Sequence, residues 1–122
     1  MGGRGAFSKT GGFTRKEYET VGEVEGVKVI EPVDKNRKKD NLPYYSNTPG
    51  TSYIKLDRDG HFQQLRVYAE DRRPLLDVDY GIDTPLTGDN KDFHAHDWVD
   101  GQRGPGRYLT DDELARFSKY FI

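Results

Sequence analysis

The chain has 122 residues, no cysteine and a formal net charge of −2. This length allows one domain, and the lack of cysteine excludes disulfide bonds, thiol catalysis and cysteine-ligated metal sites. The near-neutral charge excludes recognition of nucleic acid by a strongly basic field over the whole domain. No apolar run approaches the roughly 18 residues that span a bilayer, and no secretory signal is visible. We therefore expect a soluble, cytoplasmic protein with no membrane partner.

The first sixteen residues differ in composition from the rest of the chain. They hold four basic residues, five glycines and no acidic residue. Such a segment buries too little apolar surface to offset the entropy lost on ordering. The composition predicts a flexible basic tail over residues 1–16, and it leaves residues 17–122 as a single α+β domain.

Polar and apolar residues alternate over residues 23–30, which predicts a half-buried strand that Pro32 ends. Residues 34–50 then turn polar and predict a long loop. The basic run in this loop makes Lys38 and Lys39 candidate ligands for a phosphate group.

Three further strands are expected in the middle of the chain, joined by two tight turns. They cover residues 52–56, 61–69 and 75–81. Strands joined in this way pair as an antiparallel meander. The chain is therefore expected to contain a curved antiparallel sheet of four to six short strands.

A helix is expected at the C-terminal end of the chain. Thr110 and Glu113 have the spacing of a capping box, which marks a helix start. A helical spacing of apolar residues follows, and it predicts one face that packs on the sheet. These residues are Leu114, Phe117, Tyr120 and Phe121. The expected fold class is thus α+β, with the C-terminal helix packed on the meander.

The residues that can carry chemistry gather between Asp77 and Trp98. Alternate side chains of a strand share a face, so Asp77 and Asp79 form one pair and His94 and His96 another. Three explanations of the histidine pair stay open. It can bind a metal, it can act as an acid and a base, or it can hydrogen-bond backbone carbonyls in a structural role.

A metal site would use His94 and His96 with Asp79 or His61 as the third ligand. The spacing from Gly88 through the two histidines is close to the first motif of cupins. The chain that follows is nevertheless too short for the later strand of an eight-stranded jelly roll. We therefore expect no metal and no cofactor.

Acid–base catalysis would use the two imidazoles, which titrate near neutral pH. His94 and His96 would move the protons, and a cation would stabilise the charge on a phosphate. Arg66 and Tyr80 complete the expected catalytic set. Lys38, Lys39, Arg103 and Arg107 are the expected substrate-binding residues, and RNA is the expected substrate.

Three segments resemble a family of small proteins from phages and integrative elements of Gram-positive bacteria. They are residues 1–6, the hairpin of residues 67–80 with its Asp-Val-Asp-Tyr end, and residues 94–98. A similar block occurs near the C-termini of phage head-associated and polymorphic-toxin proteins. The resemblance implies a nuclease-like effector of the barnase, EndoU or colicin type.

The resulting hypothesis is a mobile-element-encoded domain that acts as a metal-independent ribonuclease or toxin-like effector. One alternative from another class is a non-enzymatic phage accessory or interaction module, with a phage or host protein as partner. A second alternative is a metal-binding protein built on the histidine pair. The alternatives differ in whether His94 and His96 face a polar cleft together with an arginine.

Overall fold

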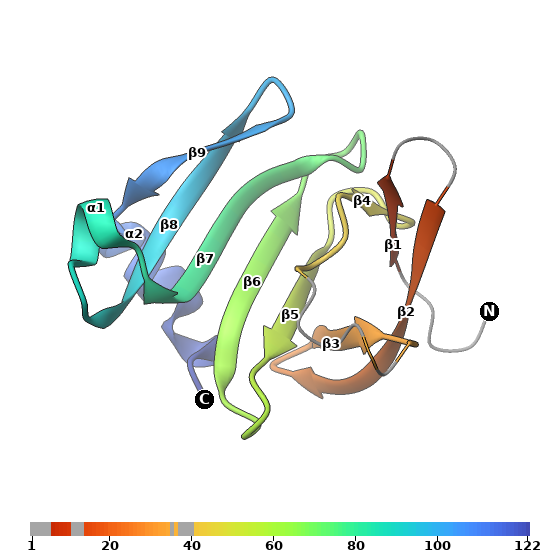
Figure 1. The fold of residues 1–122 in the computed structure, drawn as a ribbon, viewed down its shortest axis with the longest axis horizontal. Helices are drawn as coiled ribbons and strands as arrows, with labels where there is room; N and C mark the ends of the chain where they lie inside the picture. The colour runs from red at the N-terminus through yellow and green to blue at the C-terminus, as the bar shows by residue number, and fades with distance from the viewer. Residues whose placement is uncertain (1–5, 11–13, 35, 37–40) are drawn as a thin grey trace.

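The structure is a computed structural model that describes residues 6–10, 14–34, 36 and 41–122. Within these residues the chain forms nine strands, two short α-helices and one 3-10 turn (Figure 1). In chain order they are β1 (Ala6–Thr10), β2 (Thr14–Val24), β3 (Val27–Pro32), β4 (Tyr45–Ser46), β5 (Ser52–Leu56), β6 (Phe62–Tyr68), β7 (Pro74–Ile82), α1 (Thr84–Thr87), β8 (Lys91–Val99), β9 (Gln102–Arg107), α2 (Asp111–Phe117) and η2 (Ser118–Tyr120).

The strands hydrogen-bond in the order β4-β1-β2-β3-β5-β6-β7-β8-β9. All neighbours are antiparallel except β3 and β5, which run parallel. The predicted α+β class, the mostly antiparallel sheet and the C-terminal helix are confirmed. The expected number of four to six strands is wrong, because the described residues alone hold nine.

Two strands stand where the sequence predicted a single one over residues 23–30. Glu25 and Gly26 have φ angles of 48° and 83°, and they form a two-residue turn between β2 and β3. Hairpin turns of this length require positive φ at their central residues, and glycine adopts it without steric cost. The polar–apolar alternation continues across the turn, so it did not reveal the break.

The predicted loop over residues 34–50 serves as the crossover that lets β5 lie parallel to β3. It also contains β4, which pairs with β1. The predicted N-terminal tail falls only in part on described residues. Of that tail, residues 6–10 form β1 and residues 14–16 open β2.

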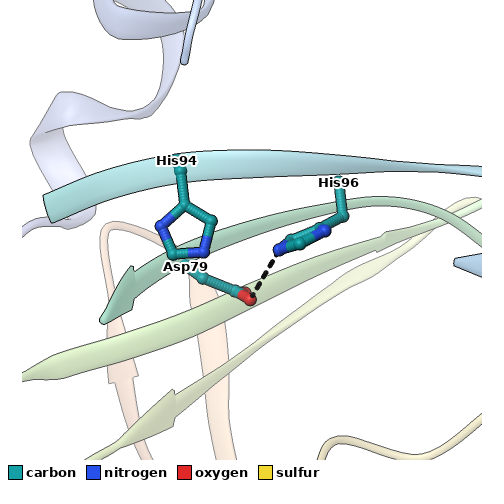
Figure 2. A group of neighbouring side chains, drawn as sticks. All are labelled: Asp79, His94 and His96. Carbon is teal, nitrogen blue, oxygen red and sulfur yellow. Dashed lines mark ion pairs between the residues drawn. The ribbon is translucent and has the colours of Figure 1, made fainter. Parts of the chain in front are cut away.

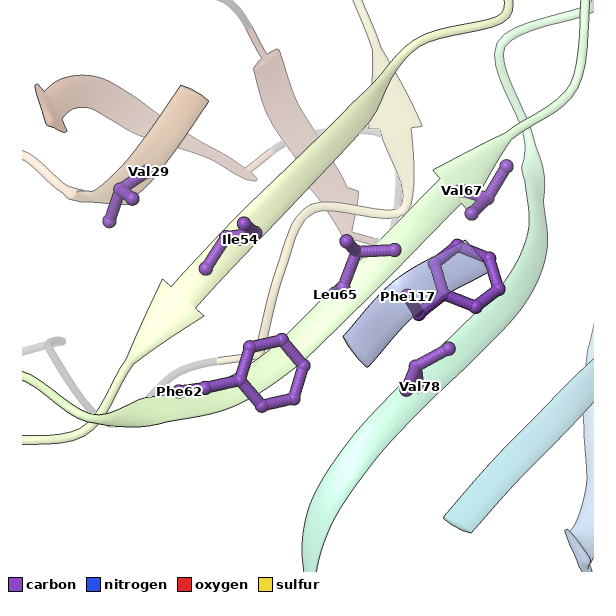
Figure 3. Close-up of a cluster of buried hydrophobic side chains, with 7 residues drawn as sticks. All are labelled: Val29, Ile54, Phe62, Leu65, Val67, Val78 and Phe117. Atoms are coloured by element: carbon purple, nitrogen blue, oxygen red, sulfur yellow. The ribbon is translucent and has the colours of Figure 1, made fainter. Parts of the chain in front are cut away.

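One face of the sheet carries the main hydrophobic core (Figure 3). Phe117 of α2 is 2% exposed and belongs to this core together with buried side chains from four strands, β3, β5, β6 and β7. α2 crosses behind β7 and β8 in the view of Figure 1. The buried members of this core are Val29, Ile54, Phe62, Leu65, Val67, Val78 and Phe117.

The opposite face of the sheet is more polar. It holds a second buried cluster of Tyr18, Ile30, Leu42, Tyr53 and Tyr68. Toward β7, β8 and β9 this face continues into buried charged and polar side chains. The alternation of side chains along each strand separates these polar groups from the core on the other face.

The capping box at the start of α2 is present as predicted. The Thr110 hydroxyl accepts a hydrogen bond from the Glu113 backbone N–H (3.1 Å), and the Glu113 carboxylate accepts one from the Thr110 N–H (2.9 Å). In the described parts of the chain, no helix has the length and apolar character to cross a membrane.

Candidate metal centre

Strand register brings an aspartate and two histidines together on the polar face. Asp79 of β7 lies opposite His94 of β8, and Asp77 lies opposite His96. One ligand atom each from Asp79, His94 and His96 lies within 4.8 Å of the others (Figure 2). The side chains that the sequence placed on one face therefore point to a common centre.

Backbone carbonyls hold both imidazoles in place. The Nδ1 atom of His94 lies 3.0 Å from the Asp92 carbonyl, and that of His96 lies 2.9 Å from the Gly104 carbonyl. A carbonyl only accepts, so each Nδ1 carries the proton and donates it. In this tautomer the Nε2 atom of each ring presents its lone pair to the centre, which is the arrangement that metal-binding histidines adopt.

Asp83 supplies a second carboxylate to the centre. It follows β7 at the N-cap position of α1, but its side chain makes no capping hydrogen bond. Its Oδ2 atom is buried without a hydrogen-bond partner in the described structure. This oxygen lies 4.0 Å from Nε2 of His94 and 3.7 Å from Nε2 of His96.

These separations are too long for hydrogen bonds, which end near 3.2 Å. Nε2 of His96 is similarly 3.8 Å from Oδ2 of Asp79. In a tetrahedral site with metal–ligand distances of about 2.0–2.1 Å, ligand atoms lie about 3.4 Å apart. The three separations of 3.7–4.0 Å exceed this value by only a few tenths of an ångström. The ligand atoms of Asp79, His94 and His96 lie up to 4.8 Å apart, so these side chains have to close by up to about 1.4 Å to hold one ion.

Gly106 of β9 makes room for Asp83. A Cβ atom at this position would lie 1.8 Å from Asp83 Oδ2 and 3.3 Å from His96 Cε1. Any larger residue would push the Asp83 carboxylate out of the centre. The glycine therefore has a geometric role in bringing Asp83 against the histidines.

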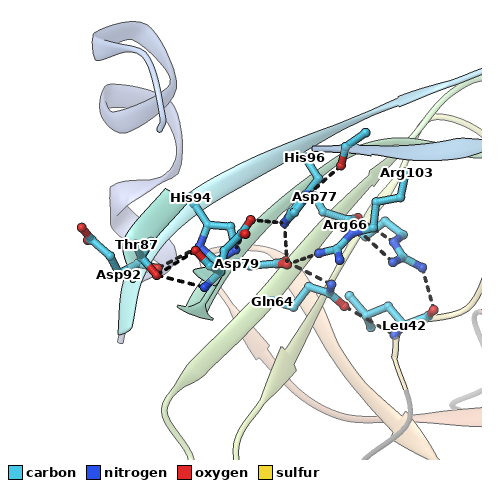
Figure 4. A network of polar contacts seen from close by, with 12 residues as sticks. Leu42, Gln64, Arg66, Asp77, Asp79, Thr87, Asp92, His94, His96 and Arg103 are labelled. Carbon is cyan, nitrogen blue, oxygen red and sulfur yellow. Dashed lines mark hydrogen bonds and ion pairs between the residues drawn. The ribbon is translucent and has the colours of Figure 1, made fainter. Parts of the chain in front are cut away.

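A network of polar and charged side chains forms hydrogen bonds with the Asp79 carboxylate (Figure 4). Gln64 donates to Asp79 Oδ1 (3.0 Å), and Arg103 donates to Asp79 Oδ2 and to Asp77 Oδ2 (2.9 Å). Burial raises the pKa of the Asp79 carboxyl above its ordinary value, although the charge of Arg103 acts in the opposite direction. Burial therefore favours the protonated form of this carboxyl, and the hydrogen bonds from Gln64 and Arg103 favour the ionised form.

The centre lies in a pocket of about 570 Å³. Its wall includes Asp79, Asp83, His94, His96 and Arg103, and Lys55 and Asn41 also line it. His94 and His96 are only 3% and 8% exposed, so the imidazoles form the floor. Arg103, with 38% of its side chain exposed, forms part of the wall.

Of the remaining residues of the expected catalytic set, Tyr80 lines the pocket of the histidines and Arg66 does not. Arg66 is buried against Asp77, to which it donates from Nε (2.7 Å) and Nη2 (3.0 Å), and it also donates to the Leu42 carbonyl. The ring of Tyr80 packs against Phe93, with centroids 4.6 Å apart.

The expected substrate-binding residues are also separated. Arg103 reaches the pocket, whereas Arg107 pairs with Asp97 and with Glu113 of α2. Lys38 and Lys39 lie outside the described residues. His61, considered as a third metal ligand, is exposed in the turn between β5 and β6.

Sequence reasoning missed Asp83 and Gln64. The available signal for Asp83 was the segment Asp83-Thr84-Pro85, in which an aspartate precedes a proline at the start of a helix. This pattern is usually explained by capping. Only the side-chain geometry shows that Asp83 does not cap.

Comparison of the chain with protein-family models, with curated proteins and with solved structures found no match. The resemblance to small phage and integrative-element proteins therefore stays a prediction. Function has to be inferred from the geometry of the centre itself.

Proposed function

We propose that the protein binds one divalent transition-metal ion between His94, His96, Asp79 and Asp83. One observation carries the proposal. The buried, unpartnered Oδ2 of Asp83 faces both Nε2 atoms at 3.7–4.0 Å, while both Nδ1 atoms are held by carbonyls. Buried polar atoms are almost always paired, so an unpaired one among candidate ligands supports an ion at this place.

The donor set indicates the kind of ion. Imidazole nitrogens with carboxylate oxygens suit zinc, iron, manganese or cobalt, whereas calcium and magnesium prefer oxygen ligands alone. A divalent charge would also offset two neighbouring carboxylates. This distinguishes the present hypothesis from the expectation, made from sequence, that the protein holds no metal.

The pocket supports a centre of the open kind. A tetrahedral ion with four protein ligands is closed, as in structural zinc sites, so a position for water or substrate requires an ion that takes a fifth or sixth ligand. A metal ion in such a position lowers the pKa of a bound water to about 7. With this chemistry the residues of the pocket would hold and orient a substrate for hydrolysis.

The proposal is tested by thermal unfolding with added Zn²⁺, Mn²⁺ or Co²⁺ and with a chelator. An ion that binds only the folded state, at one hundred times its dissociation constant, stabilises it by about 2.7 kcal/mol. We expect the wild-type melting temperature to rise by several degrees, and His94→Ala and Asp83→Asn to abolish the rise. His61→Ala is the matched control and should respond like the wild type. An equal rise in all four proteins would contradict the proposal.

A second candidate is the metal-independent ribonuclease, in which His94 and His96 act as acid and base. The observation that favours it is that both imidazoles and Arg103 line the same pocket. Asp79 and Asp83 oppose it, because their charges repel a phosphate that no metal accompanies. RNA cleavage that persists in chelator and is lost in His96→Ala would establish this candidate instead. A protein with neither metal binding nor cleavage would fit the accessory or interaction module.

A further inference from the structure

We propose that the pocket, once it holds its metal ion, binds an oxyanion and that Arg103 is the residue that binds it. This inference rests on the proposed metal centre and names the class of ligand that the centre takes. The ligand is a small molecule, or the end of a larger one, with a phosphoryl or carboxylate group.

Arg103 and the metal ion would compete for one oxygen atom of Asp79. Arg103 donates to Oδ2 of Asp79, and the same oxygen faces Nε2 of His96 at 3.8 Å. This oxygen is therefore the one that Asp79 would offer to the ion. A divalent ion bound there attracts the oxygen more strongly than a guanidinium does, and it repels the guanidinium. Metal binding therefore weakens the hold of Asp79 on Arg103.

The other partner of Arg103 is Asp77. Asp77 is fully buried and already accepts two hydrogen bonds from Arg66, at 2.7 and 3.0 Å. The charge of Asp77 is thus balanced without Arg103. Once the metal takes Asp79, Arg103 becomes a surplus cation in the wall of the pocket.

The charge of the pocket also favours an anion once the metal is bound. Its charged side chains are Asp79, Asp83, Lys55 and Arg103, which balance one another. A divalent ion makes the loaded pocket positive by two charges, so it attracts an anion. The planar guanidinium of an arginine matches the oxygens of a phosphate or carboxylate. The volume of about 570 Å³ lies in the range of small-molecule sites, about 300–1,000 Å³.

The test is a calorimetric titration of methylphosphonate, and separately of acetate, into the protein with and without one equivalent of Mn²⁺. We expect at least one of the two anions to bind only when the metal is present. Arg103→Met should weaken anion binding at least tenfold while leaving metal affinity equal to or tighter than that of the wild type. Arg107→Met is the matched control, because this arginine pairs beside α2, and it should leave anion binding unchanged.

The outcomes separate the two proposals. A protein that binds no metal overturns the metal centre together with this inference. A protein that binds metal but neither anion, or whose Arg103→Met variant binds the anion like the wild type, overturns this inference alone. Equal anion binding without metal does the same. Should Arg103→Met not fold, Arg103→Lys keeps the charge, and the loss of the planar donor pair should still weaken binding about threefold or more.

Discussion

The side chains of His94, His96 and Asp83 take their orientation from the backbone around them. His94 and His96 receive their orientation from the carbonyls of Asp92 and Gly104, so the backbone of β8 and β9 decides where Nε2 points. Asp83 is free to face them because it does not cap α1. The centre therefore depends on local backbone geometry as much as on residue type.

Gly106 gives a direct test of that geometry. Gly106→Ala places a methyl group where Asp83 Oδ2 now lies, so we expect metal affinity to fall by about 10–100-fold, as for the loss of a supporting contact. Gly81→Ala is the matched control, because no heavy atom lies within 4 Å of its Cβ position. Affinities come from competition with a chromophoric chelator. Similar affinities in the two variants would refute the role given to Gly106.

Arg66 is predicted to be structural rather than catalytic. It is 4% exposed and its partner Asp77 is fully buried, so Arg66→Ala leaves a buried charge without its partner. Such a loss destabilises a protein by about 3–5 kcal/mol. Urea denaturation would measure it. A change below about 1 kcal/mol would show that water or Arg103 takes over the role.

At the scale of the elements, α2 closes the core through one side chain. Phe117→Ala should lower the free energy of unfolding by about 3–5 kcal/mol, because the ring is 2% exposed and packs in the main core. Leu114, also predicted to lie on the packed face, is 41% exposed. Leu114→Ala should therefore cost no more than about 0.5 kcal/mol. Equal costs would mean that α2 packs through a different face.

Arg107 joins β8, β9 and α2 through two carboxylates. It donates to Asp97 (2.7 Å) and to both oxygens of Glu113 (2.8 and 2.9 Å). The hydrogen bonds from Arg107 lower the pKa of the Glu113 carboxyl to about 2. A lowered pKa adds stability that is complete above the unfolded value of 4.5 and is lost as the pH falls toward about 2.

This pH dependence can be measured with Glu113→Gln. The variant should be less stable than the wild type at pH 6, and the difference should shrink as the pH falls from about 4.5 to about 2. Chemical denaturation at several pH values gives the difference. A difference that stays constant down to pH 2 would contradict the assigned ion pair.

The sequence predicted the strands and the helix start correctly where the local pattern of residues was strong. β5, β6 and β7 and the capping box of α2 followed from local patterns. β9 did not, because the segment Gly104-Pro105-Gly106 resembles a turn by composition. Tertiary pairing with β8 makes it a strand. Its Gly106 lies where Asp83 and His96 need space, and its Gly104 lies against the backbone of Asp97.

Within the site, too, some features followed from local sequence patterns and others depended on tertiary structure. Alternation placed Asp77 with Asp79 and His94 with His96, but it left Asp79 and His61 as alternative third ligands. Only the register of β7 and β8 brings Asp79 beside the histidines. The positions of Arg66 and Arg103 did not follow from alternation, since both are long side chains on the polar face. Their positions depend on burial and strand register, which composition does not show. Arg66 lies in the interior against Asp77, and Arg103 lies at the pocket.

At the scale of the whole molecule, the main core and the candidate centre lie on opposite faces of the sheet. The face under α2 holds the main apolar core, and the other face holds the tyrosine cluster and the candidate centre. Changes at the centre should therefore alter metal binding without removing the main core. This separation lets the metal proposal be tested on a folded protein.

The most direct measurement is a titration of the protein with Co²⁺, followed by visible absorption. We expect absorption bands that saturate at one equivalent of Co²⁺, that disappear on adding a chelator, and that are absent in the His94→Ala/His96→Ala double variant. Bands that never saturate, or that the folded double variant shows at the same strength, would contradict a single metal centre formed by these histidines.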